Sequence, residues 1–437
     1  MAPYLRAHIN DADFATRFGE LQEMKREQSV DVNAAVQAII ADVRTRGDAA
    51  LIELTEKFDR QQLSPETLRI SEAEIDASFE ACTEATRNAL ELAATRIRDF
   101  HARQKPQDER FTDAAGVELG HRWTAVDAAG LYVPGGLANY PSSVLMNAIP
   151  AREAGVGRVV MVVPTPDGNV NPLVLVAARL AGVDEIYRVG GAQAIAALAY
   201  GTDTIAPVDV IVGPGNAYVA AAKKQVFGQV GIDMIAGPSE ILVVADNQND
   251  PAWMAADLLS QAEHDEVAQS ILICDDADYA DAVEQAVETG LETLSRAKIA
   301  RKSWQDFGAI LVVHDLATQA PDLINQLAPE HLELAVEDPE AMASEVRHAG
   351  AIFMGRFTPE AIGDYIAGPN HVLPTARASR YASGLSVLNF MKRSSLVKCD
   401  AASLSAIGPA AVQLAEEEGL SAHGRSISIR LNLGQES

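Results

Sequence analysis

Four short polar clusters in the second half of the chain carry side chains that could do chemistry. They are Gln261-Ala-Glu-His264, Glu330-His331, Gly363-Asp364 followed by Gly368-Pro-Asn-His371, and Glu418 with His423. Amide, imidazole and carboxylate groups supply the nitrogen and oxygen donors that suit Zn²⁺ or a similar divalent ion. The adjacent carboxylate and imidazole of Glu330 and His331 are two general acid-base groups. The clusters therefore predict a polar site, provided that the fold brings them together.

Gln261 and His264 lie at the end of a predicted helix that begins near Asp250, with Pro251 at its first position. Side chains three residues apart leave the same face of a helix, one turn from each other. The pair could supply two ligands of a metal ion or bind a polar ligand. An isolated Gln-x-x-His is more often a solvated helix end, so the prediction depends on the other clusters.

Composition narrows the class of protein. With 35 basic and 61 acidic residues, the net charge is −26 and the pI about 4.7, which argues against a nucleic-acid or anionic-membrane surface. No apolar run approaches the ~20 residues of a membrane span, and the first residues lack a signal core. Cys82, Cys274 and Cys399 are scattered and lie far from the clusters, which counts against a thiol nucleophile. We expect a cytoplasmic protein.

Residues 126–236 alternate short apolar strands with helices, as in repeated βαβ units. The predicted strands are residues 130–134, 159–163, 186–189 and 208–212, and the predicted helices are 142–154, 172–181 and 192–200. Such units form a parallel, doubly wound sheet, and ligands of these sheets bind beyond the carboxyl ends of the strands.

Three glycine turns follow these strands. They are Val133-Pro-Gly-Gly136, Val189-Gly-Gly-Ala-Gln193 and Val212-Gly-Pro-Gly-Asn216. Glycine allows the backbone to approach a phosphate closely, and the helix N-terminus that follows favours negative charge. None of the turns is a Gly-x-Gly-x-x-Gly, and any one alone could be a tight turn without a ligand. Three turns on one edge favour a nucleotide.

A second alternation covers residues 237–389, with strands at 241–245, 270–274 and 310–313 and helices at 250–265 and 279–295. Residues 1–125 are mostly helical by pattern and are expected to pack on this second module. Residues 390–437 form a tail with a helix at 401–418 and a strand-like segment at 426–432. The predicted fold class is α/β, with two incomplete, doubly wound Rossmann-like modules, a helical N-terminal region and a small C-terminal dimerisation tail.

Seven motifs closely resemble those of the histidinol dehydrogenase family, in one order along essentially the whole chain. They are Gly130-Leu-Tyr-Val-Pro-Gly-Gly136, Val189-Gly-Gly-Ala-Gln-Ala194, Gly213-Pro-Gly-Asn216, Gly237-Pro-Ser-Glu240, Gln261-Ala-Glu-His264, Pro329-Glu-His331 and Gly368-Pro-Asn-His-Val-Leu-Pro374. The resemblance implies oxidation of L-histidinol to L-histidine in two NAD-dependent steps, through an aldehyde, in a homodimer with one Zn²⁺ per subunit.

The resemblance also implies a role for each site residue. The implied zinc ligands are Gln261, His264, Asp364 and His423. His331 is expected to be the general base, and Glu330 to activate water for the second oxidation. Substrate contacts are expected from Ser239, Glu330, His331, Glu418 and the four zinc ligands, and NAD contacts from Tyr132, Gln193 and Asn216. The tail is expected to cross to the partner, where Glu418 and His423 complete the site. His371 is expected to contact the substrate or to support a ligand.

Three alternatives stay open at this point. A relative on the same scaffold could oxidise another small polyol, such as a sulfonated propanediol. A zinc hydrolase could use Glu330 to activate water without hydride transfer, although this leaves the glycine turns unexplained. A metabolite-binding protein without catalysis would tolerate the loss of His331. NADH formation separates the dehydrogenases from the other two.

Overall fold

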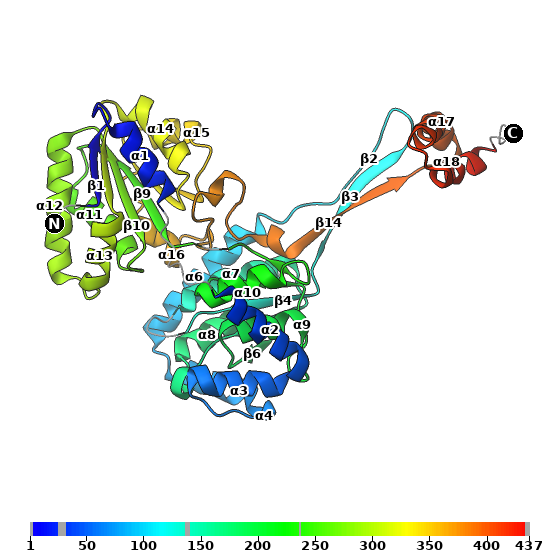
Figure 1. Ribbon diagram of the computed structural model, residues 1–437, viewed down its shortest axis with the longest axis horizontal. Helices are drawn as coiled ribbons and strands as arrows, with labels where there is room; N and C mark the ends of the chain where they lie inside the picture. The colour runs from blue at the N-terminus through cyan, green and yellow to red at the C-terminus, as the bar shows by residue number, and fades with distance from the viewer. Residues whose placement is uncertain (1–2, 25–31, 136–139, 236, 433–437) are drawn as a thin grey trace.

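The computed structural model describes residues 3–24, 32–135, 140–235 and 237–432. Two α/β units lie beside each other, and a long arm projects from them to a pair of terminal helices (Figure 1). Within the described ranges, no helix combines the length and the apolar character that crossing a bilayer requires. The predicted α/β class is confirmed, and the arm is an addition to it.

The first unit contains a five-stranded parallel sheet in the order β6-β5-β4-β7-β8. Its strands are β4 (Ala128–Tyr132), β5 (Arg158–Val162), β6 (Glu185–Tyr187), β7 (Val210–Val212) and β8 (Gly231–Ile232). The chain steps outward from β4 to β6 and then returns to the other side of β4. This order makes the sheet doubly wound, with its switch point between β4 and β7.

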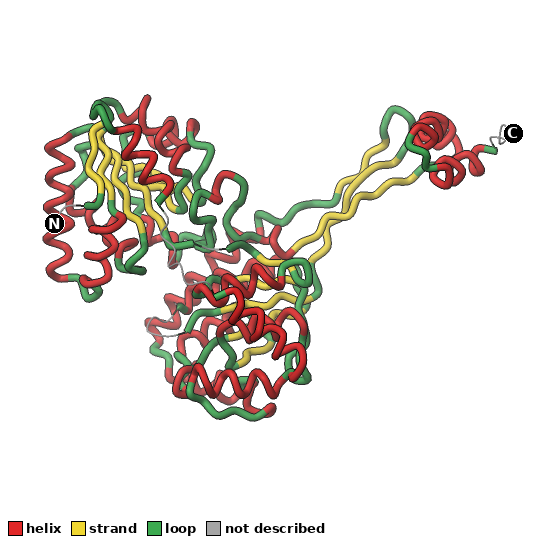
Figure 2. The backbone as a smooth tube through the Cα atoms, viewed as in Figure 1, coloured by secondary structure: helices red, strands yellow, loops and turns green. Residues whose placement is uncertain are grey.

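Helices cover both faces of this sheet (Figure 2). One face carries α5 (Glu72–Ala81), α6 (Glu84–Ala102), α7 (Pro141–Ala154) and α8 (Pro172–Ala181). The other carries α2 (Asn33–Arg46), α3 (Asp48–Asp59), α9 (Gly191–Tyr200) and α10 (Ala217–Val226), with the short α4 (Pro65–Leu68) at the edge. Because both faces are covered, the strands β4 to β7 are mostly apolar along their length, and the sequence predicts these four. The short β8 was not predicted.

The second unit contains a six-stranded parallel sheet in the order β1-β11-β10-β9-β12-β13. Its strands are β1 (Leu5–His8), β9 (Glu240–Ala245), β10 (Gln269–Cys274), β11 (Ala309–Val312), β12 (His331–Ala335) and β13 (Ala351–Met354). One face packs on α11 (Pro251–Ala262), α12 (Ala277–Thr293) and α13 (Ala297–Phe307), and the other on α1 (Phe14–Glu23), α14 (Leu316–Leu327) and α15 (Pro339–Glu345). The short α16 (Glu360–Tyr365) follows β13.

The placement expected for the N-terminal region is wrong for most of its length. Only β1 and α1 belong to the second unit, where β1 pairs with β11 and Phe14, Phe18 and Leu21 are buried. Helices α2 to α6 pack on the first unit instead. The reason is that their apolar stripes, such as Val36 and Ile40 of α2, are buried against α9 and α10 rather than against the second sheet.

The arm is a three-stranded antiparallel sheet in the order β14-β3-β2. It consists of β2 (Glu109–Thr112), β3 (Glu118–Ala125) and β14 (Met391–Lys398), and it carries α17 (Ala401–Glu417) and α18 (Ser421–Ser428) at its tip. The strand-like segment predicted at 426–432 is wrong. It forms the end of α18 and a 3-10 turn, Ile429–Leu431, and among the described residues no strand pairs with it.

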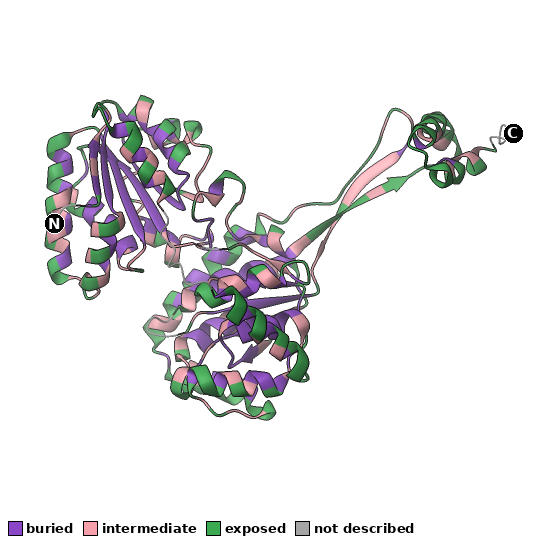
Figure 3. Ribbon diagram, viewed as in Figure 1, coloured by how far each residue is buried: buried purple, intermediate pink, exposed green. Residues whose placement is uncertain are grey.

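The tip of the arm is covered by little of its own chain (Figure 3). Its apolar side chains are exposed, with Val397 at 69%, Leu414 at 64% and Ile429 at 62%. By contrast, the central strands of both parallel sheets are buried, and only the edge strands such as β8 and β13 are partly exposed. Exposed apolar side chains gathered on one element are typical of an interaction surface.

Candidate active site

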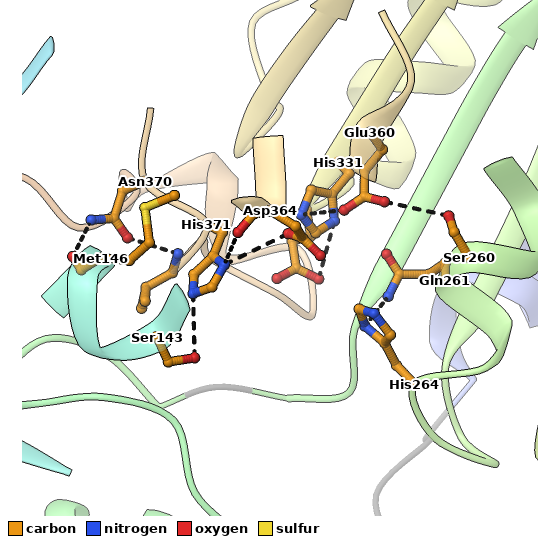
Figure 4. A network of polar contacts seen from close by, with 12 residues as sticks. Ser143, Met146, Ser260, Gln261, His264, His331, Glu360, Asp364, Asn370 and His371 are labelled. Atoms are coloured by element: carbon orange, nitrogen blue, oxygen red, sulfur yellow. Dashed lines mark hydrogen bonds and ion pairs between the residues drawn. The ribbon is translucent and has the colours of Figure 1, made fainter. Parts of the chain in front are cut away.

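Three of the four polar clusters meet at the amino edge of the second sheet (Figure 4). Glu330 and His331 stand where β12 begins, and Glu240 stands where β9 begins. This edge is opposite to the carboxyl edge at which doubly wound sheets usually hold ligands. Asp364 comes from α16, while Gln261 and His264 come from the end of α11. The helix α11 begins as predicted, since Asp250 accepts a hydrogen bond from the Ala252 N–H at 2.9 Å.

His331 is held as a neutral base. Its Nδ1 lies 2.9 Å from the backbone oxygen of Glu240, so Nδ1–H must donate and the proton of the ring sits there. The lone pair is therefore on Nε2, which is buried and has no hydrogen-bond partner among the described residues. Burial lowers the pKa of His331 to about 4, more than the negative charge of Asp364 raises it. A neutral imidazole with an unpaired nitrogen is ready to accept a proton.

Glu330 is also held by the backbone of Glu240. Its Oε2 accepts a hydrogen bond from the Glu240 N–H at 2.9 Å, so the backbone of one residue holds both members of the Glu330-His331 pair. Burial raises the pKa of Glu330 well above its usual range, and the negative charge of Glu240 raises it further. A carboxyl group with a raised pKa is a stronger base once ionised.

Glu360 joins the site although the sequence reasoning missed it. One oxygen each of Glu360 and Asp364 and one ring nitrogen of His331 lie within 4.8 Å of one another. Burial raises the pKa of Glu360, and the neighbouring Asp364 raises it further. A signal was available, because Glu360 and Asp364 are four residues apart and so share one face of a short helix. Buried carboxylates at this spacing favour a bound cation.

Gln261 and His264 contact each other as their spacing predicts. Gln261 Nε2 lies 3.2 Å from His264 Nδ1, and the Gln261 side chain is fully buried. Its Oε1 has no hydrogen-bond partner among the described residues. Ser239 lies in the loop before β9, and its backbone oxygen accepts a hydrogen bond from the Gln269 N–H at 3.0 Å. An orphaned amide oxygen beside an imidazole and a carboxylate is the donor set that Zn²⁺ accepts.

The side chain of His371 contacts both units. Its Nδ1–H donates to the backbone oxygen of Asp364 at 3.0 Å, and its Nε2 lies 3.4 Å from the Ser143 hydroxyl on α7. The helix α7 begins beyond the carboxyl end of β4. The amino edge of the second sheet therefore faces the carboxyl edge of the first.

The expected NAD residues lie at that carboxyl edge. Tyr132 ends β4, and its hydroxyl accepts from the Gly191 N–H at 3.2 Å. Gln193 on α9 is buried, and its Oε1 has no hydrogen-bond partner among the described residues. Asn216 caps α10, where its Oδ1 accepts from the N–H groups of Tyr218 and Val219.

Two of the predicted turns meet at this edge. A Cβ added to Gly135 would lie 2.6 Å from Pro164, and one added to Gly190 would lie 2.4 Å from it. Only glycine allows so close an approach of the turns. Gly136, the next residue of the first turn, lies outside the described residues.

The fourth cluster is not brought to the site in one chain. Glu418 and His423 are exposed on the helices at the tip of the arm, far from α11 and α16 (Figure 1). Of the expected ligands, Gln261, His264 and Asp364 therefore come from the second unit, and His423 is held elsewhere.

Comparison with known proteins identifies the family. The sequence profile of the histidinol dehydrogenase family matches residues 22–431. A histidinol dehydrogenase of Rhodospirillum rubrum is 67% identical over 99% of this chain and 100% of its own, and one of Ruegeria pomeroyi is 65% identical over 96% and 97%. The crystal structure of a histidinol dehydrogenase from Elizabethkingia anophelis, 36% identical, superposes with a TM-score of 0.94 over 98% of both chains. The chain belongs to the histidinol dehydrogenase family.

Proposed function

We propose that this chain oxidises L-histidinol through L-histidinaldehyde to L-histidine, the last steps of histidine biosynthesis, with two molecules of NAD and one Zn²⁺ per subunit. The activity class, an NAD-dependent dehydrogenase, follows from the family match over residues 22–431. The observation that carries the proposal is the neutral, buried His331, which forms a group of metal-ligand type with Glu360 and Asp364 at an edge that faces the first unit.

The donor set of the cluster fits a divalent cation. Gln261 Oε1 and Glu360 Oε1 are buried without hydrogen-bond partners among the described residues, and an ion at the site would satisfy such oxygens. Gln261, His264 and Asp364 would hold the ion, together with a fourth ligand. When bound, the ion would fix the amine and imidazole nitrogens of the substrate and so orient its carbinol carbon.

His331 is the general base of the proposal. Its Nε2 would take the hydroxyl proton of the alcohol, while the Nδ1–H bond to Glu240 holds the ring in the required tautomer. Burial keeps the pKa of His331 low, so the acceptor form dominates near neutral pH. NAD, when bound, accepts a hydride from the same carbon in each of the two steps.

Glu330 would serve the second oxidation. Once the aldehyde is present, the carboxylate would remove a proton from water as the water adds to the carbonyl carbon. The resulting hydrate again carries a hydroxyl group, and His331 would deprotonate it as before. The raised pKa of Glu330 strengthens its ionised form as a base.

The first unit would hold NAD. Tyr132, Gln193 and Asn216 stand at the carboxyl edge of its sheet, where α9 and α10 begin. The amino ends of helices favour the pyrophosphate, and the close glycine turns leave room for a backbone contact. The same edge faces His331 and Asp364 through the contact between Ser143 and His371.

A second copy would complete the site. The arm holds Glu418 and His423 away from their own chain, and its apolar helices are exposed. If the arms of two copies cross, each tip covers its apolar surface on the partner and brings His423 to the partner's Gln261, His264 and Asp364. The fourth ligand is then supplied by the other subunit.

The test is the yield of NADH per L-histidinol consumed, followed by absorbance in the near ultraviolet. Two molecules of NADH, with L-histidine as product, support the proposal. One NADH per substrate would indicate an alcohol dehydrogenase for another polyol, and hydrolytic products without NADH would indicate a zinc hydrolase. Either of these results contradicts the proposal.

A further inference from the structure

The loop of residues 366–372 leaves α16 of the second unit and is bound by two helices of the first. We call this loop the clamp. Its first two carbonyl groups accept hydrogen bonds from Arg96 of α6, from Nε to Ile366 at 2.6 Å and from Nη2 to Ala367 at 3.1 Å. At Gly368 the backbone is left-handed, with φ +115°, and an added Cβ would lie 3.0 Å from the Arg96 oxygen. Glycine allows the clamp to run this close to α6.

Asn370 anchors the middle of the clamp inside the first unit. Its side chain is buried, with the Nδ2 group 2.5 Å from the Met146 backbone oxygen of α7 and 3.4 Å from His101 Nε2. Its Oδ1 accepts from the Val372 N–H at 2.9 Å. The amide thus has a partner for each donor and for its oxygen, as a built polar anchor requires.

His101 can accept only because its tautomer is fixed. Its Nδ1 lies 2.7 Å from Gln104 Oε1, an acceptor, so Nδ1–H donates and Nε2 carries the lone pair. The ring is wholly buried, and burial lowers its pKa, which keeps it neutral. Asn370 therefore donates to two acceptors of the first unit, one on α6 and one on α7.

Figure 4 shows Asn370 beside Met146 of α7, with His371 between this anchor and Asp364. The next residue, His371, donates to the backbone of Asp364 and contacts Ser143 near the beginning of α7. The amino end of α7 lies at the edge that would hold NAD, and Asp364 is an expected zinc ligand. Hydrogen bonds thus connect α7, through His371, to the backbone of Asp364.

We propose that Asn370 and Arg96 are positioning residues which fix Asp364 against the first unit, so that NAD binding and zinc binding are coupled through the clamp. This inference rests on the proposed function, since it requires both groups to bind. Coupling between binding affinities is reciprocal, so a dinucleotide whose binding holds α7 in place would also tighten the binding of zinc. Tighter binding is usually expressed as slower release. Breaking the clamp separates the two sites without removing a ligand from either.

The experiment measures the rate at which zinc passes from the loaded, full-length protein to a colorimetric chelator, with and without saturating NAD. In the unmodified protein, NAD is expected to slow release by about fivefold or more, the low end of ordinary coupling. In Asn370→Ala and in Arg96→Leu, the effect of NAD on release is expected to disappear. Zinc content before chelation should remain one per subunit in Arg96→Leu, because no ligand is changed.

A matched control is available on the same helix. Arg98→Leu removes an exposed arginine of α6 that contacts Leu180 and Glu153 rather than the clamp. It should keep the full effect of NAD. Should Asn370→Ala fail to fold, as judged by circular dichroism, the exposed Arg96 carries the test alone.

Two results would overturn the proposed coupling through the clamp. One is that NAD slows zinc release equally in Arg96→Leu and in the unmodified protein. The other is that NAD has no effect on zinc release in the unmodified protein. Failure of the proposed function is distinguishable from either. It would show as an unmodified protein that holds no zinc by elemental analysis or forms no NADH from L-histidinol.

Discussion

The position of His423 leads to a complementation experiment. His264→Ala damages the cluster in the second unit, whereas His423→Ala damages the tip of the arm. Each variant alone is expected to be inactive, because every site in its homodimer lacks one ligand. The two variants are unfolded together and refolded as a mixture, which allows subunits to exchange.

The expected recovery follows from symmetry. Random pairing makes half of the dimers heterodimers, and a C2 dimer has two sites. If the arms cross, one site of each heterodimer contains both mutations and the other contains neither. Half of the dimers with one intact site out of two gives roughly a quarter of the unmodified activity. If the tail served its own chain, every site would lack a ligand and the mixture would stay inactive.

The assay is NADH formation from L-histidinol after refolding, with heterodimers confirmed by native mass spectrometry. A matched control pairs His264→Ala with Asp364→Ala, two changes in the same unit, and this mixture should recover no activity. The crossed arm is refuted if heterodimers form from the first pair and no activity returns, or if both pairs recover equally.

Four further outcomes are expected. Prolonged chelation should abolish NADH formation and Zn²⁺ should restore it; full activity in protein shown by elemental analysis to be free of metal would contradict this. His264→Ala should cost more activity than the matched His314→Ala at a strand end, and equal losses would exclude His264 as a ligand. Glu330→Gln should slow aldehyde oxidation by a factor of roughly 10²–10⁴ while largely sparing alcohol oxidation, as measured in separate half-reactions. His331→Asn should slow both half-reactions. If Glu330→Gln slowed both half-reactions equally, the separate roles assigned to Glu330 and His331 would be wrong. The pKa of His331 is about 4 in the folded protein, below the value of about 6.5 that it has in the unfolded chain. Between these two pH values only the unfolded chain binds a proton at His331, so the free energy of unfolding decreases as the pH falls. From pH 7 to pH 5 this contribution is about 2 kcal/mol, and urea unfolding of His331→Asn should show that much less acid sensitivity.

The central strands of the two parallel sheets could be predicted from the sequence because most of them are buried on both faces. The strands β1, β8, β12 and β13 were not predicted, and β8 and β13 are only partly buried. The predicted strand at 159–163 differs from β5 by one residue, and the predicted helix at 172–181 matches α8. The amino-edge position of Glu330 and His331 was not predicted, because β12 begins at His331 itself and Glu333 interrupts its apolar residues. The carboxylate of Glu360 could have been found by its four-residue spacing from Asp364.

The arm could not be predicted in the same way. Its strands β3 and β14 pair residues about 270 positions apart, such as Ala125 with Met391 and Glu118 with Lys398. Both strands are polar, and β14 is largely exposed, so neither shows the alternation that a buried face imposes. Their pairing depends on contacts that no local pattern records. The same holds for the clamp, whose partners His101 and Met146 come from distant helices.

The opposed edges of the two sheets would suit ligands of opposite charge. In a βαβ unit each helix runs antiparallel to its strands, so helix amino ends lie at the carboxyl edge and helix carboxyl ends at the amino edge. The carboxyl edge of the first sheet therefore presents the partial positive charges of α9 and α10, which favour a pyrophosphate. The amino edge of the second presents the carboxyl end of α11, where Gln261 lies, and such an end favours a cation by about 0.3–1 kcal/mol. Because the two edges face each other across Ser143 and His371, a bound dinucleotide and a bound cation would each meet the helix ends that suit its charge.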